Sequence, residues 1–361
     1  MQDKTKNIII TIGFAVILIV TFVINLIAKD QEISISERRK LAQFPEITIK
    51  KILNGDVMDK WEDYAEDQFI ERDFFRKIKA FWSTNIFGQK DNNKLFEKDG
   101  AIYKMEYPLK EKNVQKSAQK IKEVYDTYLK DMNVYYSIIP DKNYYLQKDD
   151  HLKIDFDKVE QIVGNELQGF KYIDITQGLE LEDYYKTDLH WKQENLSEVV
   201  NIIQTNMGLD NSEEIDYKLI NKGEFYGTYY GQFGKELPPD ELHILTNDII
   251  ENCTTYNVEK KKTAPIYTET KSADRYDIFV SGATPLVEIK NPNAETDKEL
   301  LLFRDSFGSS LAPLLVENYS KITLVDIRYM SSKILNNFID FNNQDVLFLY
   351  STVVLNQNIL K

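Results

Sequence analysis

The chain of 361 residues is 42% hydrophobic, enough for one large domain or for one domain with a smaller appendage. Its 45 Lys and Arg against 58 Asp and Glu give a formal net charge of −13, which argues against a nucleic-acid partner because phosphates would be repelled. A single cysteine, Cys253, excludes an internal disulfide and a cysteine-based zinc cluster.

The first element in chain order is an apolar stretch, residues 8–28. Its 21 residues are long enough to cross a bilayer as a helix, and residues 26–28 match a signal-peptidase site poorly. We therefore expect an uncleaved membrane anchor over residues 1–29. Lysines on both sides leave the orientation open by charge, but a short head before a long tail predicts a single-pass protein of the cell membrane with most of the chain extracellular.

A stalk and a helical arm are expected over residues 30–95. Asp56 and Asp73 are placed as N-caps of two helices, and the second helix carries Phe and Trp side chains at three- and four-residue spacing. Such an aromatic stripe is usually a packing face, so these side chains are expected in a core.

From residue 96 to residue 361, strands and helices alternate, which predicts one α/β domain with a parallel sheet covered by helices on both faces. After a hairpin at residues 99–100, the expected helices are 111–130, 159–167 and 331–338, and the expected strands are 135–139, 172–175, 300–303, 322–325 and 346–350. Short runs punctuated by Gly and Pro between about residues 220 and 293 predict a β-rich insertion over one edge of the sheet.

Asp188 and His190 form the first chemical element. In extended chain, residues two apart point to the same side, so Asp188 can accept a hydrogen bond from one imidazole nitrogen and leave the other free as a base. A structural pair is the alternative, because the pattern is short. A metal site is the weaker interpretation, since no second histidine lies at ligand spacing and no thiolate is available.

Ser306 is the second chemical element, between the apolar run at residues 300–303 and a predicted helix after Ser310. There its hydroxyl lies at the carboxyl edge of a sheet beside free N–H groups, which suits acyl transfer, although a serine at this point also serves as a plain helix cap. Two pairs of residues carry similar alternatives. Asp141 and Lys142 either line a site or make a solvated turn, and Tyr229 and Tyr230 either reach substrate or pack under a loop.

The sequence resembles the DHHW family of Gram-positive bacteria, a branch of the SGNH-hydrolase-like proteins that includes the alginate O-acetyltransferase periplasmic proteins. The resemblance rests on residues 38–45, 61–73, 187–191, 225–228 and 304–308, in this order and spacing. Leu189 stands where the family name has a histidine. In an extended chain, that middle position points away from the side chains of Asp188 and His190, so its replacement leaves the chemistry of this pair intact.

The resemblance implies a flavodoxin-like three-layer α/β/α sandwich with a Ser-His-Asp triad. Ser306 would be the nucleophile, His190 the base and Asp188 its orienter, with Asn356 as the nearest candidate for the oxyanion-hole asparagine. It also implies acetyl transfer to or from a cell-surface polysaccharide, a membrane-bound O-acyltransferase as acetyl donor, and no cofactor. Transferase and esterase share the acyl-enzyme and are not separated by sequence.

Two other functions remain open at this stage. The same fold can serve as a catalytically inactive polysaccharide-binding scaffold, or as a membrane-anchored assembly factor, because fold does not fix function. Of the three functions, only the enzymatic one requires a hydrogen bond between Ser306 and His190.

Overall fold

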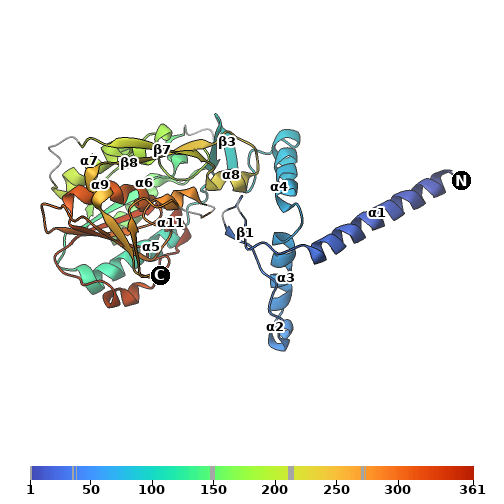
Figure 1. The fold of residues 1–361 in the computed structure, drawn as a ribbon, viewed down its shortest axis with the longest axis horizontal. Helices are drawn as coiled ribbons and strands as arrows, with labels where there is room; N and C mark the ends of the chain where they lie inside the picture. The colour runs from blue at the N-terminus through green and yellow to red at the C-terminus, as the bar shows by residue number, and fades with distance from the viewer. Residues whose placement is uncertain are drawn as a thin grey trace. The chain divides into compact units, whose positions relative to one another are not determined.

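The computed structural model describes residues 2–34, 36–37, 39–146, 151–209, 215–269, 272 and 274–361. The chain, drawn in Figure 1, separates into two compact units. The anchor unit comprises Met1–Asn93 and Tyr230–Glu236, and the sheet unit comprises Lys94–Tyr229 and Leu237–Lys361.

The anchor unit is mainly helical. Among the described residues, α1 (Gln2–Ile27) is the one helix long and apolar enough to cross a membrane, as in a single-pass anchor or a signal sequence. Its most apolar 18 residues have a mean hydropathy of 2.8. The remaining elements are β1 (Ile33–Ser34), β2 (Arg39–Lys40), α2 (Ile49–Leu53), α3 (Asp56–Asp67), α4 (Arg72–Phe81), the π-helical turn η1 (Trp82–Ile86) and the end of α8 (Thr228–Phe233).

Two expectations about this unit are wrong. The two helices form, but their N-caps are Gly55 and Glu71, not Asp56 and Asp73, which lie in the first turns. The aromatic stripe of the second helix is not in a core: Phe74, Phe75 and Phe81 are 55%, 52% and 53% exposed. Helix α4 packs on its unit through the opposite, polar face.

The sheet unit is built on eight strands in the order β10-β9-β11-β13-β12-β14-β5-β6. Five of them are parallel: β13 (Lys321–Val325), β12 (Glu299–Arg304), β14 (Asp345–Ser351), β5 (Val134–Ile139) and β6 (Lys171–Tyr172). The other three are antiparallel to their neighbours: β11 (Leu286–Lys290), β9 (Thr254–Asn257) and β10 (Lys262–Pro265).

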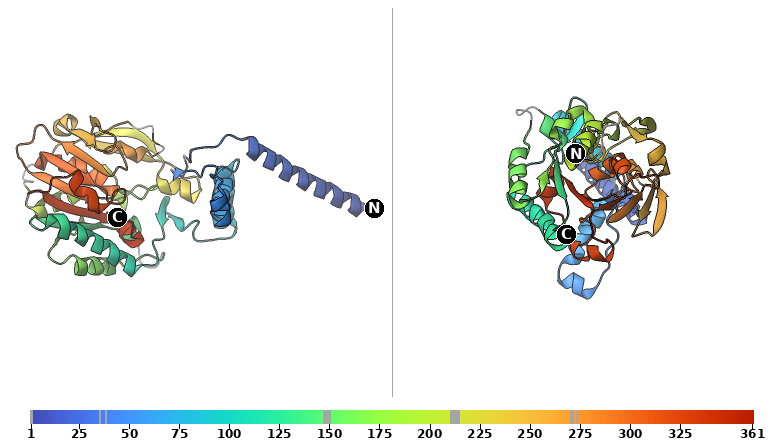
Figure 2. Two further views of the ribbon diagram at one scale, coloured as in Figure 1. Left: turned by 90° about the horizontal axis from the view of Figure 1, so that it is seen from below. Right: turned by 90° about the vertical axis from the view of Figure 1, so that its left-hand side faces the viewer.

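Alternate side chains of the central strands enter two separate cores, as the pleat of a strand requires. Leu300 and Leu302 of β12 pack with α7 (Ser197–Met207), α9 (Asp248–Asn252), α10 (Phe307–Leu311) and the 3-10 helix η8 (Ala312–Asn318). Leu301 and Phe303 pack with α5 (Glu111–Val124), α6 (Phe156–Glu166) and α11 (Thr352–Gln357), which lie along the other side of the sheet in Figure 2. The predicted three-layer α/β/α sandwich is confirmed.

Two of the expected helices are not wholly α-helical. Helix α5 continues as a π-helical turn, η2 (Tyr125–Leu129), and the helix expected at residues 331–338 is the 3-10 helix η9 (Ser332–Asn337). Further 3-10 turns are η3 (Lys142–Tyr145), η4 (Thr176–Gly178), η5 (Leu181–Asp183), η6 (Gln193–Asn195) and η7 (Arg275–Ile278).

Two antiparallel pairs lie outside the main sheet. The predicted hairpin is β3 (Leu95–Lys98) with β4 (Ala101–Lys104), and both of its turn residues, Asp99 and Gly100, have positive φ, as a tight hairpin turn needs. The other pair is β7 (Lys218–Phe225) with β8 (Asp240–Thr246). The predicted insertion thus does more than cover an edge, because β9, β10 and β11 extend the sheet itself.

Candidate active site

Ser306 lies just beyond the carboxyl end of β12, at the N-cap position of α10. Its side chain makes no capping hydrogen bond, so the hydroxyl is not used as a helix cap. Within the fully described segment 300–316, Ser306 is also the one residue that is not buried. The strand-to-helix turn therefore presents this hydroxyl, and its neighbours hold the turn in the core.

The hydroxyl of Ser306 is joined to His190 and Asp188 by two short contacts. His190 Nε2 lies 2.7 Å from Ser306 Oγ, and His190 Nδ1 lies 2.5 Å from Asp188 Oδ1. Asp188 is fully buried and His190 nearly so. The three side chains are connected in the order that a Ser-His-Asp triad requires.

Asp188 and His190 meet for a different reason from the one the sequence suggested. The segment is not an extended strand, and Asp188 Oδ1 accepts a hydrogen bond from the backbone N–H of His190 at 3.0 Å. This local turn brings carboxylate and imidazole together, while Leu189 lies between them without a part in the contact.

The motif around Gly227 holds this turn from outside. The N–H of Thr228 donates to Asp188 Oδ2 at 2.5 Å, and the N–H of Gly227 donates to Thr187 Oγ1 at 2.8 Å. A Cβ atom on Gly227 would lie 2.2 Å from the carbonyl oxygen of Thr187, so only glycine permits this approach. Asp240 adds a second clamp by accepting from the N–H groups of Lys186 and Thr187, both at 2.8 Å.

Lys142 supports the same turn from within the protein. Its ammonium group is buried and donates to the carbonyl oxygens of Tyr185 at 2.8 Å, Lys186 at 3.2 Å and Asp188 at 2.8 Å. Burial lowers the pKa of Lys142 to about 8, opposed by the nearby carboxylates, of which Asp141 has the largest effect. Burial also raises the pKa of Asp141 to about 6. The strand-end pair is therefore buried and bonded to the site's own loop, and it is not a solvated turn.

Tyr276 fixes the plane of the imidazole. Its ring stacks on His190 at a centroid distance of 3.9 Å and an interplanar angle of 9°. The hydroxyl of Tyr276 donates to Ser310 Oγ at 2.7 Å, and the indole N–H of Trp191 reaches the same oxygen at 2.9 Å. Sequence analysis did not single out Tyr276, because nothing in its neighbourhood distinguishes it from the other tyrosines.

Asn356 does not fit the oxyanion position expected for it. Its Oδ1 accepts from the N–H of Lys110 at 2.7 Å, and its Nδ2 donates to Glu106 Oε1 at 3.0 Å and to the carbonyl oxygen of Pro108 at 3.3 Å. These bonds fasten α11 to the segment before α5. Both ends of the amide are thus engaged in a structural contact.

Backbone donors near Ser306 are more limited than the sequence suggested. The N–H of Phe307 donates to Asp305 Oδ1 at 3.0 Å, and the other oxygen of that carboxylate accepts from the N–H of Ser351 at 2.8 Å. Among the described residues, the N–H of Ser306 has no partner. It is the donor left for an oxyanion at this turn.

The two tyrosines expected near substrate lie elsewhere. Tyr229 is buried at 3% exposure, its hydroxyl is 3.4 Å from Asp141 Oδ2, and its ring faces the Lys142 ammonium at 5.3 Å. This is the packing role that was the alternative. Tyr230 belongs to the anchor unit. Among the described residues, no group of three or more His, Cys, Asp or Glu is arranged to hold a metal ion.

Comparisons with known proteins agree with the fold and with the family resemblance. The family model described as DHHW protein matches residues 156–325. A DHHW family protein from Eubacterium siraeum superimposes with a TM-score of 0.60 at 20% identity, over 73% of this chain and 93% of that one. Bacillus cereus PatB1, solved with a sulfonyl adduct, gives 0.57 at 19% identity over 74% and 96% of the two chains. No curated protein matches the chain.

Proposed function

We propose that this chain, which matches the DHHW family model over residues 156–325, is a membrane-anchored acyltransferase that carries an acetyl group on Ser306. The group would be transferred to or from a polysaccharide at the outer face of the cell membrane. A membrane-bound O-acyltransferase is the proposed acetyl donor.

The observation that carries the proposal is the hydrogen-bonded chain from buried Asp188 through His190 to Ser306. Only the serine end of this chain is open to solvent, while the base and its carboxylate are enclosed. A buried carboxylate that holds the imidazole by one nitrogen leaves the other to remove the serine proton.

The first half-reaction forms the acyl-enzyme. Ser306 Oγ bonds to the acetyl carbonyl carbon while its proton passes to His190 Nε2, and Asp188 stabilises the resulting imidazolium. The bond to the donor's leaving atom then breaks, and that atom takes the proton from His190. The N–H of Ser306 would donate to the carbonyl oxygen as its negative charge develops.

The second half-reaction returns the enzyme to its starting state. A sugar hydroxyl gives its proton to His190 Nε2 and bonds to the carbonyl carbon. The bond to Ser306 Oγ breaks, and the proton returns to that oxygen. If water takes the place of the sugar, the same steps make the protein an esterase.

The scaffold function keeps one observation in its favour. The engagement of Asn356 with residues 106–110 leaves the oxyanion hole with one identified donor, the N–H of Ser306. Removal of one such donor costs roughly a hundredfold to a thousandfold in turnover in well-studied hydrolases, so a poor hole is compatible with loss of catalysis.

The test is acetylation of the full chain in detergent micelles by para-nitrophenyl acetate, followed by peptide mass spectrometry. We expect an acetyl group on Ser306 that is absent from Ser306→Ala and His190→Ala. The rate should fall by about a thousandfold to ten-thousandfold in Asp188→Asn, which favours the wrong imidazole tautomer. A sulfonyl fluoride is a second probe, because PatB1 has been solved with a sulfonyl adduct.

Ser309→Ala is the matched control, since it removes a neighbouring serine hydroxyl from the same helical segment. It should keep the adduct. A folded wild-type chain that gains no acetyl group would favour the scaffold function. Faster loss of the adduct on addition of a polysaccharide would favour transfer over hydrolysis.

A further inference from the structure

Helix α4 of the anchor unit has its apolar side turned outward. Phe74, Phe75, Ile78 and Phe81 follow helical spacing, and Trp82 continues the same stripe into η1. Each of the three phenylalanines is more than half exposed, and Trp82 is 49% exposed. We call these five residues, with Phe69 beside them, the aromatic face. Water is a poor environment for so much contiguous apolar surface.

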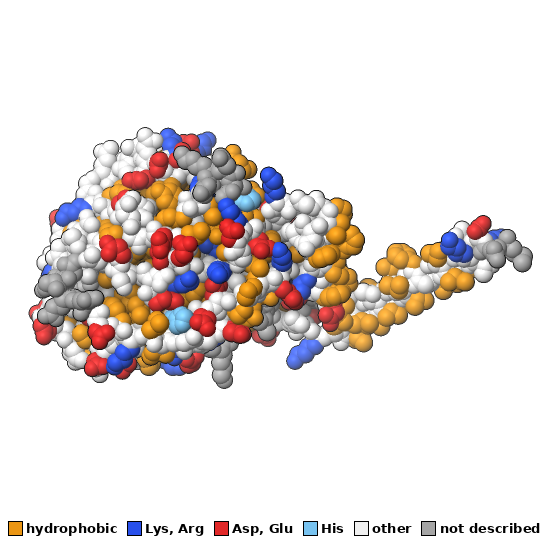
Figure 3. Space-filling view, turned by 90° about the horizontal axis from the view of Figure 1, so that it is seen from above, with side chains coloured by type: hydrophobic (Ala, Val, Ile, Leu, Met, Phe, Trp, Pro, Cys, Tyr) orange, Lys and Arg blue, Asp and Glu red, His pale blue; other side chains and the backbone are white. Residues whose placement is uncertain are grey.

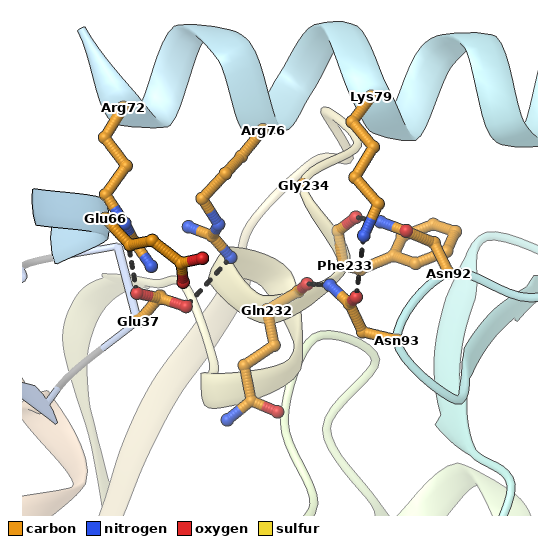
Figure 4. A pocket seen from close by; sticks show the side chains of 10 residues that line it. All are labelled: Glu37, Glu66, Arg72, Arg76, Lys79, Asn92, Asn93, Gln232, Phe233 and Gly234. Carbon is orange, nitrogen blue, oxygen red and sulfur yellow. Dashed lines mark hydrogen bonds and ion pairs between the residues drawn. The ribbon is translucent and has the colours of Figure 1, made fainter. Parts of the chain in front are cut away.

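The opposite face of α4 is polar, yet it is the face that packs on the rest of the unit. Arg72 and Arg76 have side chains only 20% and 18% exposed, and both pair with Glu37, at 2.6 and 3.3 Å. Figure 4 shows these side chains and Lys79 pointing from α4 into a pocket of about 470 Å³. This arrangement inverts the usual helix of a water-soluble protein, whose apolar stripe faces the core.

The segment that leads into α4 is bonded to the end of α1. The N–H of Ile70, two residues before α4, donates to Asn25 Oδ1 at 2.8 Å, and Asn25 lies in the last turn of α1. A second bond joins the Tyr64 hydroxyl to Asp30 Oδ1 at 2.9 Å, just past the end of α1. At 1.5 Å per residue, Asn25 is about 3 Å along the axis from Ile27. The start of α4 is therefore held at the depth where α1 leaves the hydrocarbon.

The direction of the helices suits a position in the plane of the membrane. Figures 1 and 2 show α3 and α4 running across the direction of α1, not along it. In Figure 3, hydrophobic side chains cover α1 and form a band on the neighbouring helical segment, on the side toward which α1 extends. A bilayer crossed by α1 would therefore lie against this band.

We propose that the aromatic face of α4 and η1 inserts into the boundary between headgroups and acyl chains of the bilayer that α1 crosses. Trp and Phe are enriched at this depth, and an amphipathic helix lies there with its apolar side down and its polar side up. The face thus forms a second membrane contact beside the anchor and limits how far the helical arm can tilt from the membrane plane. The inference is independent of acyl transfer, but it requires that α1 stays attached.

Tryptophan fluorescence tests the proposal, because the chain has three tryptophans and Trp191 is fully buried in the sheet unit. In full-length Trp61→Phe, Trp82 is the exposed emitter. The protein is reconstituted into vesicles of equal parts phosphatidylcholine and phosphatidylglycerol, with or without bromine on the acyl chains. We expect brominated lipid to remove most of the Trp82 emission and aqueous iodide to remove little.

The matched control is Trp61→Phe with Trp82→Phe, in which only Trp191 emits and brominated lipid should have little effect. Phe75→Asp in the Trp61→Phe background should shift quenching from bromine to iodide, with near-ultraviolet circular dichroism unchanged as evidence of folding. Quenching of Trp82 by iodide alone in the parent variant would overturn the proposal. Protection from both quenchers would also overturn it and would point to a second copy or another protein on this face.

Discussion

Lys142 is the side chain whose replacement tests the account of the site most directly. Its ammonium group lies under the turn that carries Asp188 and donates to three backbone carbonyl oxygens. Lys142→Met keeps an unbranched side chain of similar length and removes all three donors. It also removes the positive charge that most lowers the pKa of the buried Asp141 carboxyl.

The cost can be worked from these contacts. The carbonyl oxygen of Lys186 keeps the Ile102 N–H as a donor at 2.8 Å, so the main losses fall on the oxygens of Tyr185 and Asp188. Each lost hydrogen bond from a charged donor costs about 1.5–3 kcal/mol, and the two lost bonds together are the main cost. We expect unfolding to be easier by about 3–5 kcal/mol and the melting temperature to fall by roughly 10 °C.

The assay is thermal unfolding of the full chain in detergent micelles, followed by near-ultraviolet circular dichroism, with the rate of Ser306 acetylation measured beside it. Lys186→Met, an exposed lysine of the same loop, is the matched control and should stay within about 0.5 kcal/mol of the parent. Asp141→Asn combined with Lys142→Met should be less destabilised than Lys142→Met alone, because no unpaired carboxylate remains. A Lys142→Met protein that melts and reacts like the Lys186→Met control would refute the reasoning.

Two further predictions concern packing and pH. Gly308→Ala brings a Cβ atom to 2.6 Å from Arg304 Cβ. The free energy of unfolding, measured by thermal unfolding, should fall by about 1–3 kcal/mol, and Ser306 acetylation should slow as α10 shifts. An unchanged acetylation rate would contradict this close packing. Asp141 has a pKa raised from 3.8 to about 6 chiefly by burial, so its contribution to stability is present below pH 3.8 and is lost as pH rises through about 6. That contribution is roughly 3 kcal/mol, and urea unfolding between these pH values should vary less in Asp141→Asn than in the parent; equal pH dependence in the two proteins would contradict the assignment.

The central sheet was predictable because each of its middle strands is a short, mainly apolar run bounded by polar residues or proline. The run at residues 300–303 and those in β13 and β14 lie within one residue of the expected limits at either end. The position of Ser306 followed, since a polar residue just after such a run must lie at the carboxyl edge. Local patterns of this kind depend only on burial and on strand periodicity.

The support of the site was not predictable, because it depends on contacts between distant segments. Lys142 reaches carbonyl oxygens more than 40 residues away, and Tyr276 lies 86 positions after the histidine on which it stacks. Asn356 failed as an oxyanion candidate for the same reason: its partners, at residues 106–110, are set by how α11 packs against α5. The prediction that the aromatic face of α4 lies in a core was wrong, because periodicity identifies the apolar side of a helix but not what covers that side.

The strand order also affects how the molecule is made. Strand β5 lies between β6 and β14, so its edge toward β14 stays open until residues more than 200 positions later have been synthesised. The turn at Ser306 also depends on the pairing of β14, because Asp305 accepts a hydrogen bond from the N–H of Ser351 at the end of that strand. For most of its synthesis the nascent chain therefore carries an unpaired edge on β5, and once residue 306 has been made, its turn stays incomplete until β14 follows. Pairing of β14 closes that exposed edge and completes the reactive centre together.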